Sequence, residues 1–308
     1  MLTRRSVILA KIESTYNTDP TPATSADEVL VENLAWANEG LRMNERPAVR
    51  PSLGALQHVY GGRLLAVTFD VEVKGSGTAG AAPEIGALLR ACALGETIVA
   101  ITSVTYAPVS TAHESITLYL YEDGKLIKVT GARGEVAFTL EAGNKVMANF
   151  SFKGHVSAQT DVSLPTPSFD STAPVPYTGG SFAIDSFAGV IGSLSFALGN
   201  TVSTPPSVNG SDGYGEVTIT GRDVTGSFDP EDELVATEDW IGNFISGASM
   251  VLATGAIGSV AGNIINITMP AVYYRDVAPG DRDGIRSFDM SYAAAESTTD
   301  DEISIALT

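Results

Sequence analysis

The chain has 308 residues and a formal net charge of −18, from 18 basic and 36 acidic side chains. Residues 1–165 hold 14 basic and 17 acidic residues (net −3), whereas residues 166–308 hold 4 and 19 (net −15). A chain of this charge repels polyanions at long range, which excludes a protein that grips nucleic acid, although an acidic surface also simply favours solubility. Cys92 is the single cysteine, so the sequence excludes an intrachain disulfide and a thiolate metal cluster.

The composition favours many strands joined by tight turns. Hydrophobic residues make up 44% of the chain, which also contains 31 glycines and 15 prolines. Apolar residues never run together for the length of a membrane span, so we expect none. The apolar run Val7–Ala10 is too short for the core of a signal peptide, and we expect production in a cytoplasm.

The first residues are rich in Thr, Ser, Pro and Asp, and residues 1–28 are predicted to form an N-terminal arm outside the first core. Strand candidates follow at Val29–Trp36 and Ala66–Val73, where apolar and polar residues alternate. Between them, residues 38–62 form a long polar excursion with no core of their own.

A helix is predicted to begin at Pro83, a favoured first helical position, and to end at Gly95. Apolar residues at helical spacing give it one apolar face, which we expect to cover one side of a sheet. Asp123-Gly124 is a strong hairpin signal between two strands, and Gly143 marks a second turn. The strand candidates are Ser115–Tyr121, Leu126–Thr130, Glu135–Leu140 and Val146–Phe152.

The second part of the chain repeats this order. A Pro-rich stretch, residues 164–180, breaks all periodicity and is predicted to be a linker. A helix is predicted from the N-cap Thr237 to Gly247, and residues 199–215 form a second long excursion. The strand candidates are Ser181–Phe187, Glu216–Thr220, Asn263–Thr268, Ala271–Tyr274, Ile285–Tyr292 and Glu302–Leu307. We therefore expect two antiparallel β modules with one helix each, related by duplication.

Two features of this repeat point to assembly. A chain of two equivalent modules can build rings that contain twice as many modules as chains. A long stretch without its own core is usually functional or is ordered by a partner, and both excursions fall at the same place in the repeat. Hairpins that reach onto the next subunit would explain both.

Candidate ligand sites are weak. Gly75-Ser-Gly-Thr-Ala-Gly80 matches a dinucleotide fingerprint, but the strand before it alternates as a half-solvated antiparallel strand does, which favours a flexible loop. Asp276 and Gly280–Gly284 suggest a calcium loop, but the spacing departs from an EF-hand and Arg282 lies among the ligands. A polar turn between strands is the better interpretation.

Candidate catalytic groups are equally unconvincing, and we predict no catalytic, cofactor-binding or metal-binding residues and no cofactor. Adjacent acids are usually a solvated surface, the histidines lack a neighbouring acid or nucleophile pattern, and Cys92 lies on the helix face predicted to be buried. Three glycosylation motifs carry no meaning without a secretory signal. The residues concerned are Asp229, Glu231, Asp232, Glu233, Asp300, Asp301, Glu302, His58, His113, His155, Asn149, Asn209 and Asn266.

Several segments of the chain resemble the major tail tube proteins of long flexible-tailed bacteriophages. In the first module the likeness is carried by Lys11–Pro22, by Val73–Pro83 leading into Leu88–Cys92, and by Leu126–Gly134. In the second module, Ile267–Tyr274 and Asp281–Tyr292 are similar to the closing strands of a tube domain.

The resemblance implies a mainly β fold of two tandem β-sandwich or barrel-like tail-tube domains, each with one short flanking α-helix. The domains would cover residues 29–163 and 181–308. Six domains per ring, stacked into a hollow tube in the virion tail, would carry the genome DNA without specific binding. Rings would contain three chains with pseudo-sixfold symmetry, or six chains, and tail terminator, tape-measure and baseplate proteins would be partners. We expect acids of the second module to face the lumen, and Arg and Lys of the first to contribute more to subunit contacts.

Two other functions remain open at this point. A two-domain β adhesin or carbohydrate-binding protein needs exposed aromatics on a flat face, whereas Trp36 and Trp240 fall in patterns typical of a core. A metal-dependent hydrolase would be built on the acidic loops. Rings or tubes of the purified protein favour the structural function, monomers favour the adhesin, and an activity lost with chelator favours the hydrolase.

Overall fold

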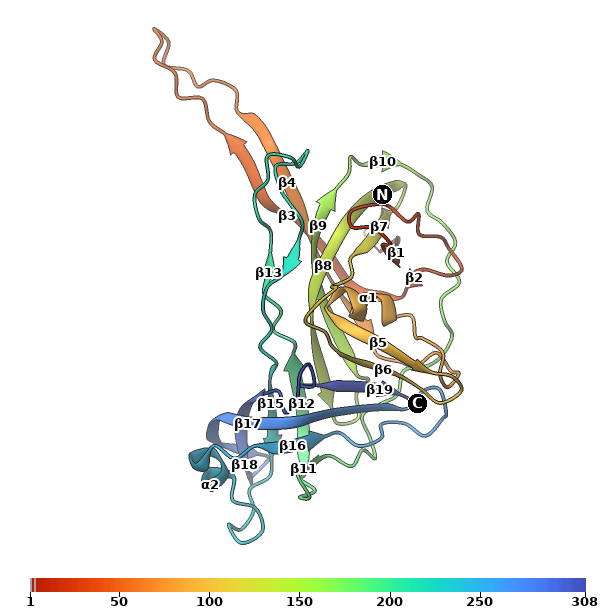
Figure 1. Cartoon of the computed structure of the whole chain (residues 1–308), viewed down its shortest axis with the longest axis vertical. Coiled ribbons are helices and arrows are strands. Elements are labelled where there is room, and N and C mark those ends of the chain that lie inside the picture. Colours follow the sequence, from red (N-terminus) through yellow and green to blue (C-terminus); the bar gives the residue numbers. More distant parts are fainter. Residues whose placement is uncertain (1, 3) are drawn as a thin grey trace.

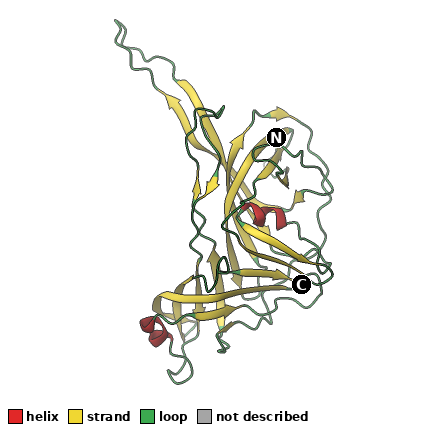
Figure 2. Ribbon diagram, viewed as in Figure 1, coloured by secondary structure: helices red, strands yellow, loops and turns green. Residues whose placement is uncertain are grey.

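The computed structural model describes residue 2 and residues 4–308, and it is mainly β, with 49% of residues in strands and 4% in helices. The strands form one antiparallel network of 17 strands and one separate two-stranded sheet (Figure 2). This confirms the prediction of a mainly β, antiparallel fold. None of the helices among the described residues has the length and apolar character needed to cross a membrane.

The first half of the chain contributes ten strands and one helix (Figure 1). They are β1 (Ser6–Ile12), β2 (Glu28–Val29), β3 (Val31–Asn44), β4 (Val59–Glu72), α1 (Gly86–Ala91), β5 (Leu94–Val99), β6 (Ser103–Pro108), β7 (Ile116–Glu122), β8 (Lys125–Glu141), β9 (Met147–Val156) and β10 (Thr160–Asp161). The predicted hairpin at Asp123-Gly124 and the turn at Gly143 are confirmed; Gly124 and Gly143 have φ values of 108° and 81°.

The second half contributes nine strands and one helix. They are β11 (Ala183–Ile184), β12 (Ile191–Ala197), β13 (Val202–Ser203), β14 (Thr218–Ile219), β15 (Thr225–Pro230), α2 (Trp240–Ser246), β16 (Met250–Ala253), β17 (Ile265–Arg282), β18 (Ile285–Ala294) and β19 (Ser304–Leu307). The predicted strands at 181–187 and 216–220 shrink to two residues each. The two predicted strands at 263–274 are one continuous strand, β17, which bends at a bulge between Tyr274 and Asp276.

The two halves share one strand order. In the first half the pairing runs β3-β4-β9-β8, and in the second half it runs β12-β15-β18-β17. In each half the helix follows the second strand of this set. β1 and β11 pair at equivalent places, with β7 and β16 respectively. The two halves, which share only a weak sequence pattern, therefore share the same order of paired strands.

The halves join through their sheets. β8 pairs with β12 over Ala137–Glu141, so the two sets of four strands form one continuous eight-stranded sheet. β6 and β19 make a second link. Phe138 and Phe196 face each other across the first junction, both almost fully buried, with ring centroids 4.7 Å apart. We call this β8–β12 junction the seam.

Strict alternation explains why the sheet has one buried face. In β4, Leu65, Val67, Phe69 and Val71 are buried, whereas the residues between them are at least partly exposed. Successive side chains of a strand point to opposite faces, so this pattern places the main core on one side. Leu64, on the other face of β4, is buried in a small separate cluster with Tyr214 and Val217. A single core cluster extends through both halves.

The helices are shorter than predicted but lie where the sequence placed them. α1 ends when Ala93 takes a left-handed conformation (φ 62°), so Gly95 falls in β5 instead of terminating the helix. α2 ends at Gly247 in the left-handed region, as expected. Its N-cap is Asp239, whose carboxylate accepts the Gly242 N–H, in place of the predicted Thr237.

The N-terminal segment differs from the prediction of an arm outside the core. β1 pairs with β7 along its whole length, and Ile8 is fully buried. The segment after it is anchored by the buried Glu13, which accepts hydrogen bonds from Ser115, Thr117 and the Gly131 N–H. These partners lie over 100 residues away in sequence, so no local pattern reveals them.

The Pro-rich stretch 164–180 contains no strand and lies along the first half. The Asp170 N–H donates to the Glu84 carboxylate at 2.5 Å, and the Lys74 ammonium donates to the Asp170 carbonyl. Tyr177 is buried in the common core. The stretch is therefore a packed connection between the halves.

We predict that the aromatic stack at the seam holds the halves together. Replacing Phe196 by Ala should lower the free energy of unfolding by about 3–5 kcal/mol, because a large side chain leaves a cavity. Ser195→Ala on the same strand but the opposite face is the matched control and should change stability by less than about 0.5 kcal/mol. Chemical denaturation of the unassembled protein measures both; equal effects would contradict the assignment.

Candidate assembly surface

The face of the eight-stranded sheet that points away from the core is lined largely by short side chains. Cross-strand register brings them into rows that cross the seam without interruption. One row contains Asn149, Ala137, Ala197 and Thr225, and the next contains Met147, Thr139, Ser195, Ser227 and Ser291. The result is a smooth polar surface, which we call the polar face.

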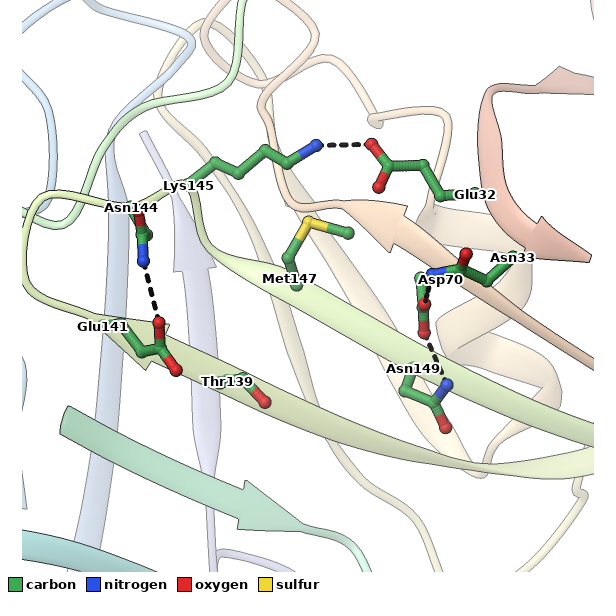
Figure 3. A pocket seen from close by; sticks show the side chains of 9 residues that line it. All are labelled: Glu32, Asn33, Asp70, Thr139, Glu141, Asn144, Lys145, Met147 and Asn149. Carbon is green, nitrogen blue, oxygen red and sulfur yellow. Dashed lines mark hydrogen bonds and ion pairs between the residues drawn. The ribbon is translucent and has the colours of Figure 1, made fainter.

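Acidic side chains are added to this surface on β3, on β4 and at the end of β8 (Figure 3). Asp70 accepts hydrogen bonds from the side-chain amides of Asn33 and Asn149 at 2.6 and 2.5 Å. Glu141 accepts one from Asn144. The second half adds Asp229 and Asp289, so the acids come from both halves.

The cations beside the polar face are neutralised within the chain. Lys145 pairs with Glu32 and with Glu72, the latter at 2.7 Å. Lys153 pairs with Glu39 at 2.9 Å, and Arg275 pairs with Asp223 at 2.8 Å. A cation already paired with a carboxylate has less to gain from a phosphate, so these ion pairs weaken any attraction of this face for a polyanion.

The first excursion is a hairpin that projects from the body. β3 and β4 run past the core, and residues 38–62, which we call the projecting hairpin, extend to one end of the molecule (Figure 1). Its apolar side chains are not covered by other parts of the chain, and Val49 and Leu53 are fully exposed. Exposed apolar groups gathered on a projection indicate an interaction site.

The second excursion packs along the base of this hairpin. The Arg42 guanidinium donates to the Gly213 carbonyl at 2.8 Å and lies 4.0 Å from the centre of the Tyr214 ring. The Tyr214 hydroxyl donates to the Gly40 carbonyl. Gly62 has a φ of 116°, and a Cβ there would lie 1.8 Å from the Asp212 carbonyl oxygen, so only glycine permits this approach.

A family model described as phage tail tube protein matches residues 3–306, nearly the whole chain. The chain belongs to the phage tail tube protein family. It is a structural component of the virion tail, where tube proteins assemble with one another. No curated protein matches it. The comparison lends no support to an adhesin.

Two contacts that fix the second excursion of the tube protein were missed by sequence reasoning. Arg133 is buried and donates to the Glu216 carboxylate and the Val217 carbonyl at 2.7 and 2.6 Å. His155, which seemed isolated, lies between the Asp212 carboxylate at 2.6 Å and the Tyr16 hydroxyl at 3.1 Å. Since all these partners lie far apart in sequence, no local motif could identify them.

Glu135 on β8 holds the start of the second excursion. Its carboxylate accepts the N–H groups of Gly199 and Asn200 at 2.7 and 2.5 Å. Burial raises the pKa of Glu135 to about 7, although these N–H groups act in the opposite direction. The tube protein therefore contains a carboxyl group that titrates near neutral pH.

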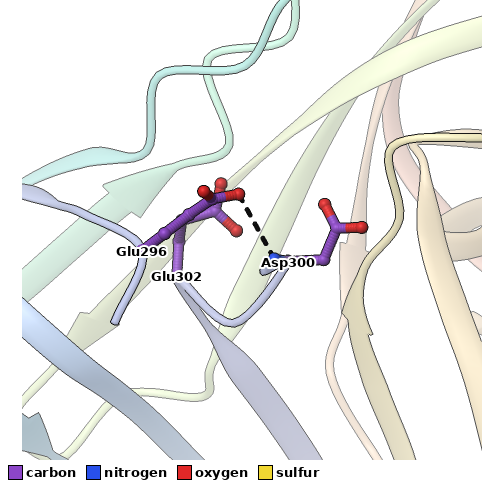
Figure 4. Close-up of side chains that lie close together, drawn as sticks. All are labelled: Glu296, Asp300 and Glu302. Carbon is purple, nitrogen blue, oxygen red and sulfur yellow. Dashed lines mark hydrogen bonds between the residues drawn. The ribbon is translucent and has the colours of Figure 1, made fainter. Parts of the chain in front are cut away.

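The acidic cluster near the C-terminus contains its own cation. Oxygens of Glu296, Asp300 and Glu302 lie within 4.8 Å of one another (Figure 4). The Arg222 guanidinium donates to Glu302 at 2.8 Å and to Asp300 at 3.1 Å. The hydroxyl groups of Ser297 and Thr298 each donate to the Asp301 carboxylate at 2.7 Å, and these hydrogen bonds lower the pKa of Asp301 to about 2. These contacts give Asp300, Asp301 and Glu302 structural roles.

The other acidic motif is a hairpin turn. Asp281 accepts the Gly284 N–H at 3.1 Å, and Asp283 and Gly284 have φ values of 54° and 87°. Consecutive positive φ values are typical of the turns that join antiparallel strands. The interpretation of residues 280–284 as a polar turn between β17 and β18 is confirmed.

The glycine-rich loop packs the halves together. The Gly75 N–H donates to the Asn263 side chain, and the Gly77 N–H donates to the Gly262 carbonyl. A Cβ on Gly75 would lie 1.9 Å from the Gly262 carbonyl oxygen. The glycines therefore allow close backbone approach between the halves.

The remaining candidates lie apart from one another. Cys92 is buried, as predicted, and burial raises the pKa of its thiol far above the usual range. His58 is exposed on the projecting hairpin, whereas His113 contacts the Val109 carbonyl. The glycosylation motifs begin at Asn149 on the polar face, Asn209 in the second excursion and Asn266 in β17. Trp240 is buried, whereas Trp36 is only partly covered.

We predict a pH dependence of stability that depends on Glu135. Because its pKa is about 7 in the folded chain and 4.5 ordinarily, the folded state binds more protons between these values. Stability should therefore fall by roughly 2–3 kcal/mol as pH rises from about 4.5 to 7.5. Glu135→Gln should remove this slope, whereas Glu141→Gln, an exposed acid of the same strand, should keep it. Denaturation at several pH values tests this; an unchanged slope in Glu135→Gln refutes it.

Proposed function

We propose that three copies of this chain form one ring of the tail tube, with six tube domains in a pseudo-sixfold arrangement. The observation that carries this is the repeated strand order together with the seam. Within one chain, the last strand of the first set (β8) already pairs with the first strand of the second set (β12). The same contact, repeated between chains, would close a ring.

The strands needed for this contact have open edges. Among the described residues, β3 pairs with β4 alone. β16 and β19 cover the outer edge of β17 only as far as Val272, so Asp276–Arg282 pairs with β18 alone. β8 has a bulge before the residues that pair with β12, and β17 has a bulge before the residues Asp276–Arg282. β17 of one copy would thus meet β3 of the next as β8 meets β12.

The two tube domains would correspond to residues 29–163 and 181–308, with the stretch 164–180 connecting them. β1 packs in the first core, which supports including residues 6–12 in the first domain. The halves share a core and a sheet, so the domains act as one body. Each is a repeat unit that is completed by its neighbours.

The polar face would line the bore. Small hydroxyl and amide side chains, paired cations and exposed acids together offer DNA no cation to bind, and repulsion acts over a Debye length of about 8 Å. DNA would then pass without specific contacts and the chain would act without catalytic chemistry. Terminator, tape-measure and baseplate proteins would meet the tube at its ends and inside it.

Ring composition tests the first part of the proposal. Native mass measurement of single rings should give three chains of 32.0 kDa each. An averaged view down the tube axis should show six similar densities that alternate between two kinds. Six chains per ring would contradict the proposal.

Charge placed on the polar face tests the second part. Thr68→Lys combined with Thr139→Lys puts cations on two exposed positions of this face. DNA ejection from virions triggered in vitro should slow about tenfold at low salt and recover at high salt, because screening weakens binding to phosphates. Matched Thr→Glu changes should leave the rate unchanged. If the Lys variant ejects DNA at the normal rate from intact tails, the polar face does not line the bore.

A further inference from the structure

The equivalent connections of the two halves fold differently. In each half a long connection joins the first two strands of the shared strand order, β3 to β4 and β12 to β15. The first connection forms the projecting hairpin, which extends away from the body of the molecule (Figure 1). The second connection, which contains the second excursion, packs along the base of that hairpin instead.

The strand pairing of the projecting hairpin is interrupted at its base. The register between β3 and β4 shifts twice, between Glu39 and Arg42 and between Arg42 and Met43. Gly40 and Gly62 lie at the same place and have φ values of 56° and 116°. Register shifts and glycines both allow a pair of strands to bend, so the two strands alone do not fix the direction of the hairpin.

The second excursion contacts the hairpin at this interruption. The Tyr214 hydroxyl donates to the Gly40 carbonyl, and its ring lies 4.0 Å from the Arg42 guanidinium. Arg42 also donates to the Gly213 carbonyl at 2.8 Å. Tyr214 packs on Leu64 of β4, which is fully buried. The second excursion therefore contacts both strands of the hairpin where their own pairing is weakest.

A second set of contacts attaches the second excursion to the body. The Asp212 carboxylate lies 2.6 Å from the Nδ1 atom of His155 on β9. The Val217 N–H donates to the Tyr16 hydroxyl at 2.7 Å, and the Val217 carbonyl accepts from Arg133 of β8 at 2.6 Å. The second excursion therefore links the hairpin to β8, to β9 and to the N-terminal segment.

We propose that the second excursion is a conformational clamp that holds the projecting hairpin in one direction relative to the body. When the clamp contacts are lost, the hairpin swings about Gly40 and Gly62. The clamp does not depend on the number of chains in a ring. Its effect on function follows from the exposed apolar residues of the hairpin. A segment that is already ordered loses less conformational freedom on binding, so the clamp strengthens the contact that the hairpin makes with a partner.

The distance between two spin labels in the full-length, unassembled protein tests the clamp. Val59→Cys places one label on the hairpin beyond the glycines, and Thr97→Cys places the other on β5 of the body; both positions are exposed. Native Cys92 is buried and stays unlabelled. Double electron–electron resonance should give one narrow distance distribution in this labelled parent protein.

Substitutions on both sides of the clamp should widen this distribution. Tyr214→Ala and Arg42→Gln remove the contacts between the second excursion and the hairpin, and each should widen it about twofold or more. Tyr16→Phe removes the hydrogen bond to Val217 without touching the hairpin and should also widen it, to a smaller extent.

The matched control is Arg63→Gln. Arg63 lies on β4 of the body just past the hairpin, where it hydrogen-bonds to Asn38 of β3, so the distribution should stay narrow.

Three results would overturn the clamp. They are a broad distribution in the parent protein, an unchanged distribution in Arg42→Gln, and equal broadening by the control Arg63→Gln. If Tyr214→Ala fails to fold, Arg42→Gln decides the question, because Arg42 lies outside the buried clusters. All of these results are read in the unassembled chain and leave the ring proposal standing.

Discussion

The structure depends on backbone pairing that one chain leaves incomplete. β3 and the outer half of β17 are strand edges without partners among the described residues, although the seam between β8 and β12 joins equivalent elements within the chain. An unpaired strand edge in a free protein is prone to aggregation. In the proposed ring the same edges would form the contact between copies, and the seam between β8 and β12 shows the geometry of that contact within one chain.

The two faces of the eight-stranded sheet differ in character. The inner face holds one core shared by both halves, with the Phe138–Phe196 stack where the sets of strands meet. The outer face carries small polar residues and acids, and its cations are paired. Strand alternation makes this division possible, because each residue faces either the core or the polar face. The buried core and the polar face thus arise from the same strands.

Sequence patterns predicted the elements well and their partners poorly. The Asp123-Gly124 hairpin, the end of α2 at Gly247 and burial of Cys92 follow from local chemistry, and the family was identified from short segments. The seam, the contacts of Glu13 and the Asp212–His155–Tyr16 chain join residues far apart in sequence, so their existence depends on the fold. The N-terminal segment was predicted wrongly for this reason. Its polar composition gives no sign of the buried strand β1, and the carboxylate that anchors it, Glu13, belongs to a residue type that is usually exposed to solvent.

Hydrogen exchange measured before and after assembly shows whether neighbouring copies pair with the open edges of β3 and β17. If open edges are completed by neighbouring copies, amide protection should rise in β3 over residues 31–39 and in β17 over residues 276–282. The seam between β8 and β12 should be protected equally in both states. Tubes in which β3 and β17 exchange as fast as in the unassembled chain would contradict the account.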